Sequence, residues 1–186
     1  IKDKNHRLKK MRYYSLQRFC LRVLTNLFIP FWFKLDNLMV KRKLNITNNK
    51  TKVIVSLTTF PGRINKVWLV IECILRQSYQ PDHIILWLSK DQFNGLQSLP
   101  ENLLRLQKKG LEIKFCEGDI RSHKKYFYSL KNFPDDLIIT VDDDFFYPTT
   151  LIKELVSTHQ NYPKAICCCR ALKYRFSKNG KLDKKK

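Results

Sequence analysis

An apolar segment that ends in three consecutive aspartates constrains this chain more than any other stretch. Residues 137–141 read Leu-Ile-Ile-Thr-Val, which is typical of a strand buried inside a sheet. Asp142, Asp143 and Asp144 follow directly. Because unpaired carboxylates are costly to bury, we expect this end of the strand to open into a site.

The aspartate triplet has two interpretations. Alternation along a strand predicts Asp142 and Asp144 on one side and Asp143 on the other. Like charges this close repel unless a cation, a basic side chain or a proton lies between them. A hard divalent cation fits, because it takes oxygen ligands and commonly bridges to substrate phosphates. The alternative is a hydrated acidic turn, or a cluster capping the helix expected from Pro148.

The rest of the chain alternates between strand and helix patterns. Apolar residues at helical spacing follow the first strand, and a second apolar run comes within about 35 residues, as in a βαβ unit. The pattern predicts an α/β domain with a mainly parallel sheet flanked by helices. The third strand alternates polar and apolar residues, so we expect it near an edge. Expected strands are 53–58, 83–89, 111–116, 137–141 and 165–169, and expected helices are 64–77, 100–109, a segment through residue 130, and 149–159.

The length and the net charge limit the number of domains and the kind of partner. The 186 residues, 44% of them hydrophobic, suit one domain with a real core. A formal net charge of +20 points to an anionic partner, which can be nucleic acid, a phospholipid surface or a phosphorylated small molecule. We divide the chain into a basic, partly apolar segment at 1–50, a domain at 51–175 and a basic tail at 176–186.

The apolar segment around residues 19–33 is interrupted by Arg22, Asn26 and Pro30. It falls short of the roughly 20 apolar residues of a membrane-spanning helix. Two interpretations remain open: an amphipathic segment on an anionic membrane surface, or a helix packed on the domain. The expected location is cytoplasmic, with peripheral contact on the inner face of the cell membrane.

The six cysteines show no paired spacing of a zinc site. Cys167, Cys168 and Cys169 stand in an apolar, strand-like run, where neighbours point to opposite faces and cannot all pair. We expect reduced, buried thiols in a cytosolic protein.

Three loops are expected to meet beyond the carboxyl ends of the strands, where parallel sheets bind ligands. They span residues 58–63, 119–125 and 142–144, and they bring hydroxyls, basic side chains and carboxylates to one cleft. Basic and acidic loops together suggest a metal-bound polyphosphate. The sequence contains neither GxxxxGK[ST] nor GxGxxG, which argues against a P-loop enzyme and a dinucleotide dehydrogenase.

Four blocks in this order resemble the nucleotide-diphospho-sugar glycosyltransferases of the GT-A fold. The blocks are residues 55–63, 84–89, 119–125 and 141–144, and the resemblance runs from residue 53 to about residue 171. The most similar group is of the family 2 type, associated with bacterial surface polysaccharide synthesis. The acidic triplet alone is a weak motif, but the four blocks in sequence are more specific.

The resemblance implies a site. Asp142, Asp143 and Asp144 correspond to the DxD motif, in which Asp142 and Asp144 hold Mn²⁺ or Mg²⁺ against the diphosphate of the donor. The implied donor-binding residues are Thr58, Thr59, Arg63, Asp119, Lys124, Asp142 and Asp143. The metal would act as a Lewis acid for the departing nucleoside diphosphate. The implied partners are a nucleotide-sugar donor and a glycan or lipid-linked acceptor.

Simpler interpretations exist for several of these residues. Thr58 and Thr59 can cap the following helix, Arg63 can be a solvated loop charge, and Lys124 can belong to an ordinary helix surface. Each alternative places the side chain away from a shared site.

No catalytic base is placed by a motif. Forty-two residues follow Asp144, and His159 and Asp183 are the nearest candidates among them. The alternatives are a short family member, a C-terminally truncated product that binds nucleotide without activity, or a donor-binding half. A basic nucleic-acid-binding protein is a rival interpretation, although no specific recognition motif supports it.

Overall fold

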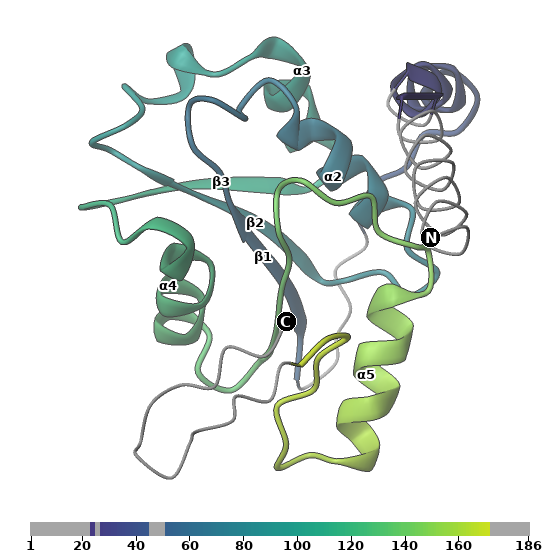
Figure 1. Cartoon of the computed structure of the whole chain (residues 1–186), viewed down its shortest axis with the longest axis vertical. Helices are drawn as coiled ribbons and strands as arrows, with labels where there is room; N and C mark the ends of the chain where they lie inside the picture. Colours follow the sequence, from purple (N-terminus) through teal and green to yellow (C-terminus); the bar gives the residue numbers. More distant parts are fainter. Residues whose placement is uncertain (1–22, 25–26, 45–50, 172–186) are drawn as a thin grey trace, which may run out of the picture.

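A four-stranded, wholly parallel sheet forms the centre of the computed structural model, which describes residues 23–24, 27–44 and 51–171. The strands lie in the order β3-β2-β1-β4 (Figure 1). Their bounds are β1 Val53–Thr58, β2 His83–Ser89, β3 Leu111–Cys116 and β4 Leu137–Thr140. The α/β class and the parallel pairing are as predicted, and β3 does lie at an edge.

Helices cover both faces of this sheet (Figure 1). On one face the main core joins the strands to α2 Val67–Leu75, α3 Glu101–Leu104 with the 3₁₀ turn after it, and α5 Leu151–Asn161. The opposite face is covered by α4 Lys124–Asn132. The domain therefore has three layers, with the sheet in the middle.

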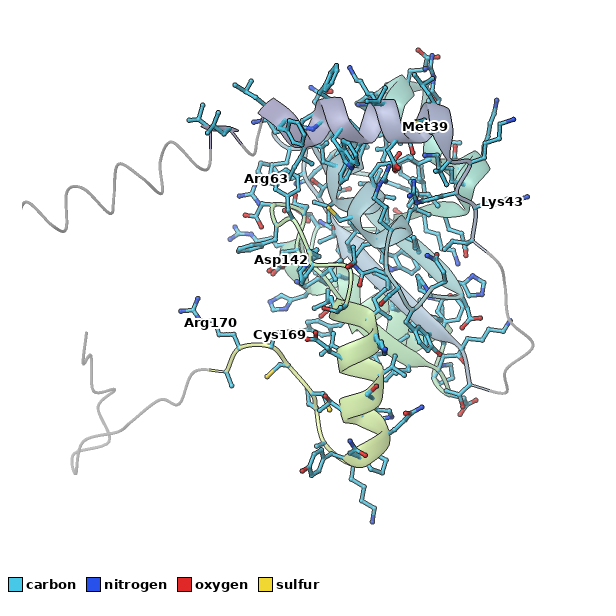
Figure 2. All side chains as sticks on the ribbon, turned by 90° about the vertical axis from the view of Figure 1, so that its right-hand side faces the viewer. Met39, Lys43, Arg63, Asp142, Cys169 and Arg170 are labelled. Carbon is cyan, nitrogen blue, oxygen red and sulfur yellow. The ribbon has the colours of Figure 1, made fainter. Side chains whose placement is uncertain are left out.

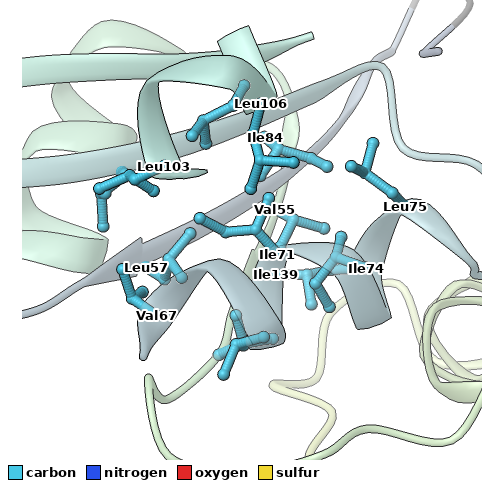
Figure 3. Close-up of a cluster of buried hydrophobic side chains, with 14 of the residues drawn as sticks. Val55, Leu57, Val67, Ile71, Ile74, Leu75, Ile84, Leu103, Leu106 and Ile139 are labelled. Carbon is cyan, nitrogen blue, oxygen red and sulfur yellow. The ribbon is translucent and has the colours of Figure 1, made fainter. Parts of the chain in front are cut away.

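Alternation along β1 explains how both faces become buried. Val55 and Leu57 point into the main core with Ile71 of α2 and Ile84 of β2 (Figure 3). Ile54 belongs to the second cluster, under α4. Because both faces are covered, the strand reads as a continuous apolar run, which is why its bounds were predictable.

The strand order places a topological switch point beside β1. From β1 the chain passes to β2 and β3 on one side, and then returns to β4 on the other side. The connections leaving β1 and β4 therefore diverge at their carboxyl ends. In open parallel sheets this crevice is the usual ligand site.

Residues 27–39 are helical and pack on the domain through one side. Phe33 is buried, and the guanidinium of Arg76 lies 4.2 Å from its ring centroid. Farther along, Leu44 joins the main core and its side chain lies against Gly110, where a Cβ would approach Leu44 Cβ to 2.9 Å. Gly110 also has a φ of +108°, so glycine is required there on two grounds.

The helix at residues 27–39 therefore packs on the domain, as one of the two interpretations predicted. This packing uses only one side of the helix, so it does not test the interpretation that the segment contacts a membrane. No helix in the described part of the chain has the length and apolar character needed to cross a membrane.

Three details differ from the sequence predictions. No strand forms at 165–169, because this run has no partner strand and is largely exposed, Ile166 being 98% accessible. Cys168 and Cys169 are exposed and Cys167 is half-buried, so only Cys73 and Cys116, among the cysteines that the structure describes, are the buried free thiols expected. Helix α2 begins at Val67 rather than Ile64, because residues 61–66 form turns.

Candidate functional site

A pocket of about 550 Å³ lies at the carboxyl ends of the strands, and it gathers every metal-binding and donor-binding residue predicted from the sequence. Its volume falls within the range of about 300–1,000 Å³ common for small-molecule sites. Figure 2 shows Arg63 and Asp142 on the same side of the molecule. The predicted residues that line it are Thr58, Thr59, Arg63, Asp119, Lys124, Asp142, Asp143 and Asp144.

Arg63 binds two of the three aspartates. Its Nη1 donates to Asp143 Oδ1 at 2.7 Å and lies 3.0 Å from Asp144 Oδ2. Thr59 Oγ1 donates to the other oxygen of Asp143 at 2.6 Å. These contacts join the loop after β1 to the loop after β4, across the switch point. The hydrogen bond to Asp143 is the main reason that the pKa of Arg63 is raised above its ordinary value, so Arg63 stays charged.

The alternation predicted for the triplet is wrong, because β4 ends at Thr140 and the aspartates lie in a turn. Asp143 and Asp144 share Arg63, whereas Asp142 forms its ion pair with Lys125 of α4. The triplet does not cap a helix either, since α5 follows Thr150 without a side-chain cap. Each carboxylate is instead neutralised by a basic side chain from another element.

Tyr147 fixes the backbone of Asp142 through a hydrogen bond. The Asp142 N–H donates to Tyr147 Oη at 2.8 Å. Burial raises the pKa of Tyr147 to about 12, so the phenol remains protonated at neutral pH. This contact closes the turn that carries the aspartates.

Asp119 and Lys124 form a second polar group in the pocket. The Lys124 side chain is only 2% accessible and its ammonium donates to Asp119 Oδ1. Gln92 Nε2 donates to Asp119 Oδ2 at 2.7 Å, and the Arg121 N–H donates to Oδ1 at 2.9 Å. The hydrogen bond from Lys124 is the largest contribution that holds the pKa of Asp119 below its usual value. Asp119 is therefore an ionised acceptor whose position is fixed from three directions.

The simpler interpretations of these side chains are not met. Thr58 Oγ1 donates to Trp87 O at 2.8 Å, within the sheet, and α2 has no side-chain cap. Arg63 is paired with aspartates although its side chain is 42% accessible, and Lys124 is buried rather than part of a surface. The hydroxyl of Thr58 thus donates to a backbone carbonyl of the sheet, although the residue lines the pocket.

Phe60 and Lys125 also line the pocket and lie in the loops expected to meet there, whereas Gln92 and Phe145 were not identified from the sequence. Gln92 Oε1 is buried and has no hydrogen-bond partner within the described residues. Its signal was its position three residues beyond the end of β2, at the same edge of the sheet as the other loops. Phe60 and Phe145 are exposed aromatic rings at the pocket, and Arg63 lies 5.4 Å from the Phe60 ring centroid.

Buried hydroxyls fix α4 beneath this pocket. Trp87 Nε1 donates to Ser129 Oγ at 2.8 Å, and Ser129 Oγ donates to Ser56 Oγ at 2.7 Å. Ser56 Oγ in turn donates to the carbonyl of Lys125. The chain of hydrogen bonds links β2, α4 and β1, and it ends at the residue whose side chain pairs with Asp142.

The carboxylates suit a hard cation in their chemistry, although they do not form a complete protein cage. Among the described residues no group of three or more His, Cys, Asp or Glu side chains is arranged to hold a metal ion. Asp142 and Asp144 are nevertheless partly exposed oxygen donors at the pocket. Mg²⁺ typically binds through one or two carboxylates together with substrate phosphates and water, so the donor set fits such an ion.

Comparison with known proteins leaves the site to be judged on its own geometry. The chain matches no protein-family model, and it matches no curated protein.

Proposed function

We propose that this chain is a metal-dependent glycosyltransferase of the GT-A type, moving a sugar from a nucleotide-diphosphate donor to a glycan or lipid-linked acceptor, as in bacterial surface polysaccharide synthesis. The observation that carries the proposal is the charge balance of the pocket. A diphosphate adds negative charge that this lining does not neutralise, so its binding calls for an accompanying cation. Four basic side chains, Arg63, Arg121, Lys124 and Lys125, line the pocket with four aspartates, Asp119, Asp142, Asp143 and Asp144.

Asp142 and Asp144 are the residues proposed to hold Mn²⁺ or Mg²⁺. When bound, the ion supplies Lewis-acid stabilisation of negative charge on a leaving diphosphate. Lys125, which pairs with Asp142 here, and the Arg63 N–H groups that Asp143 does not use would be the donors to phosphate oxygens. Asp143 keeps its bonds to Thr59 and Arg63 and holds the two loops together.

Other residues of the pocket lining suit a nucleoside. Asp119 is a fixed, ionised acceptor on the pocket lining, and Gln92 lies beside it and donates to its Oδ2. Phe60 is an exposed ring on which a base can stack. Such an arrangement suits a base with an N–H donor on its edge, such as uracil or guanine.

Of the two acid–base candidates considered from the sequence, His159 lies on α5 and does not line the pocket. Asp183 lies outside the described residues. The proposal therefore rests on donor binding and leaving-group stabilisation, and transfer must be shown directly.

The first experiment is calorimetric titration of UDP and GDP, with and without Mn²⁺, into the wild type, Asp144→Ala and Asp135→Ala. We expect metal-dependent binding to the wild type that weakens at least about tenfold in Asp144→Ala, since a charged ligand to the cation is lost. Asp135 is an exposed carboxylate before β4, at the opposite end of the same strand, so its variant should bind like the wild type.

Absence of binding by UDP and GDP, and then by CMP and dTDP, would remove the donor site and with it the proposal. Donor binding without sugar transfer or donor hydrolysis would indicate a nucleotide-binding protein without activity. Nucleic-acid binding that survives loss of Asp142 and Asp144 would favour the rival interpretation based on the net charge.

A further inference from the structure

The helix at residues 27–39 carries a second apolar face, which nothing in the described part of the chain covers. Phe31 is 64% accessible, whereas Phe33, two residues later, is 7% accessible. We call this set of side chains the outer apolar face. Its members are Leu27, Phe28, Phe31, Trp32, Leu35, Leu38 and Met39, all exposed.

The outer apolar face lies opposite the side that contacts the domain. Its members recur every three or four residues, so they form one stripe along the helix. The domain-facing positions are Phe33, Asp36 and Asn37, about half a turn away from Phe31 and Leu35. One helix thus carries two separate contact surfaces.

A buried polar network fixes this orientation. Arg76 Nη2 donates to Asp36 Oδ2 at 2.6 Å, and Arg76 also pairs with Glu72, which is 2% accessible. Asn37 Nδ2 donates to Glu72 Oε1 at 2.8 Å, and Lys109 Nζ donates to the same oxygen at 2.9 Å. Rotating the helix to bury the outer face would break the bonds to Asp36 and Asn37, so the apolar stripe is held outward.

The charge of the N-terminal part of the sequence indicates the partner of this face. Residues 1–44 contain twelve Lys or Arg and two Asp, which is half of the net charge of +20. One of these acids, Asp36, is already paired with Arg42 and Arg76. A second copy of the chain would bring two such basic segments together, whereas an anionic surface would neutralise them.

We propose that the outer apolar face docks on an anionic lipid bilayer, with the helix lying in the plane of the interface. Leucine and phenylalanine side chains enter the acyl boundary, Trp32 lies at the headgroup level, and the flanking cations contact acidic headgroups. The polar network then sets how the domain stands on the membrane. The inference is independent of the chemistry in the pocket.

Vesicle flotation tests the proposal on the full chain, using phosphatidylcholine vesicles with and without phosphatidylglycerol. We expect binding to the anionic vesicles that falls more than about tenfold in the double variant Phe31→Ser, Leu35→Ser, because two inserting side chains become polar. The matched control is Phe127→Ser, Leu130→Ser, which removes two comparably exposed apolar residues from α4. This control should float like the wild type.

A second readout reports the depth of the helix. Brominated phosphatidylcholine should quench part of the tryptophan emission of the wild type, and that part should be lost in Trp32→Phe. Equal flotation of the Phe31/Leu35 variant and the wild type would overturn the proposal, since the basic segment alone would then drive binding. Sedimentation showing a dimer that the same variant dissociates, with no flotation of the wild type, would assign the face to a second copy instead.

Discussion

The three consecutive aspartates in the pocket differ in their contacts and exposure. Asp143 is 10% accessible and has both carboxylate oxygens engaged, by Thr59 and Arg63. Asp142 and Asp144 are more exposed and each depends on one basic side chain. We therefore interpret Asp143 as the residue that holds the two loops together, while its neighbours remain accessible to a ligand.

Cys73 offers a test of burial at the residue scale. Burial in α2 raises the pKa of its thiol to about 11 from an ordinary value of 9.0. The unfolded thiol ionises first, so this contribution to stability is present below about pH 9 and lost as the pH rises towards 11. Urea titrations should show the wild type losing about 2–3 kcal/mol more than Cys73→Ala between pH 8 and 11. Parallel pH profiles for the two proteins would contradict the burial of this thiol.

At the scale of elements, the position of α4 decides the geometry of the basic side of the pocket. The helix begins at Lys124, whose side chain is buried against Asp119, and continues with Lys125 beside Asp142. Hydroxyls of Ser56 and Ser129 connect this helix to the sheet. A small shift of α4 would therefore change both ion pairs together.

Ser129→Ala tests that connection. The substitution leaves the buried Trp87 N–H without its acceptor, and an unsatisfied buried donor costs about 1–3 kcal/mol. The midpoint of urea unfolding should fall accordingly. Ser157→Ala, on the exposed side of α5, is the matched control and should change stability by less than about 0.5 kcal/mol. Equal midpoints for the two variants would show that the hydroxyl chain does not hold α4.

For the whole molecule, the polar network around Glu72 joins the helix at 27–39 to the sheet domain. Arg76 contacts both Glu72 and Asp36, so it spans the two parts. Lys109, which follows α3 in the chain, adds a third attachment. The helix at residues 27–39 is thus attached to the sheet domain by polar contacts.

Arg76→Met should loosen this junction. Glu72 keeps Lys109 and Asn37, but removing one partner of a buried ion pair typically costs about 3–5 kcal/mol. Limited proteolysis should then cut first near residues 27–44. The control Arg105→Met breaks an exposed pair with Glu101, which contributes less than about 1 kcal/mol. Identical digestion of both variants would exclude Arg76 as the attachment point.

Local sequence patterns predicted the three longer strands to the residue. β1 and β2 are buried on both faces, so their apolar runs contrast with the polar residues that bound them, whereas the edge strand β3 alternates apolar and polar residues and is half-buried. The same criterion failed at 165–169, where an apolar run has no strand to pair with. Amino-acid pattern reports how well a segment suits a buried strand, but pairing depends on what lies beside it.

The sequence by itself determined the parallel α/β class and the set of loops that meet at one edge, because both follow from strand and helix order. Tertiary structure alone decided which polar side chain meets which carboxylate. Arg63 and Asp143 are 80 residues apart, and Gln92 and Asp119 are 27 apart. Such pairs depend on how turns and helices place side chains across the sheet, and local periodicity carries no information about contacts at that separation.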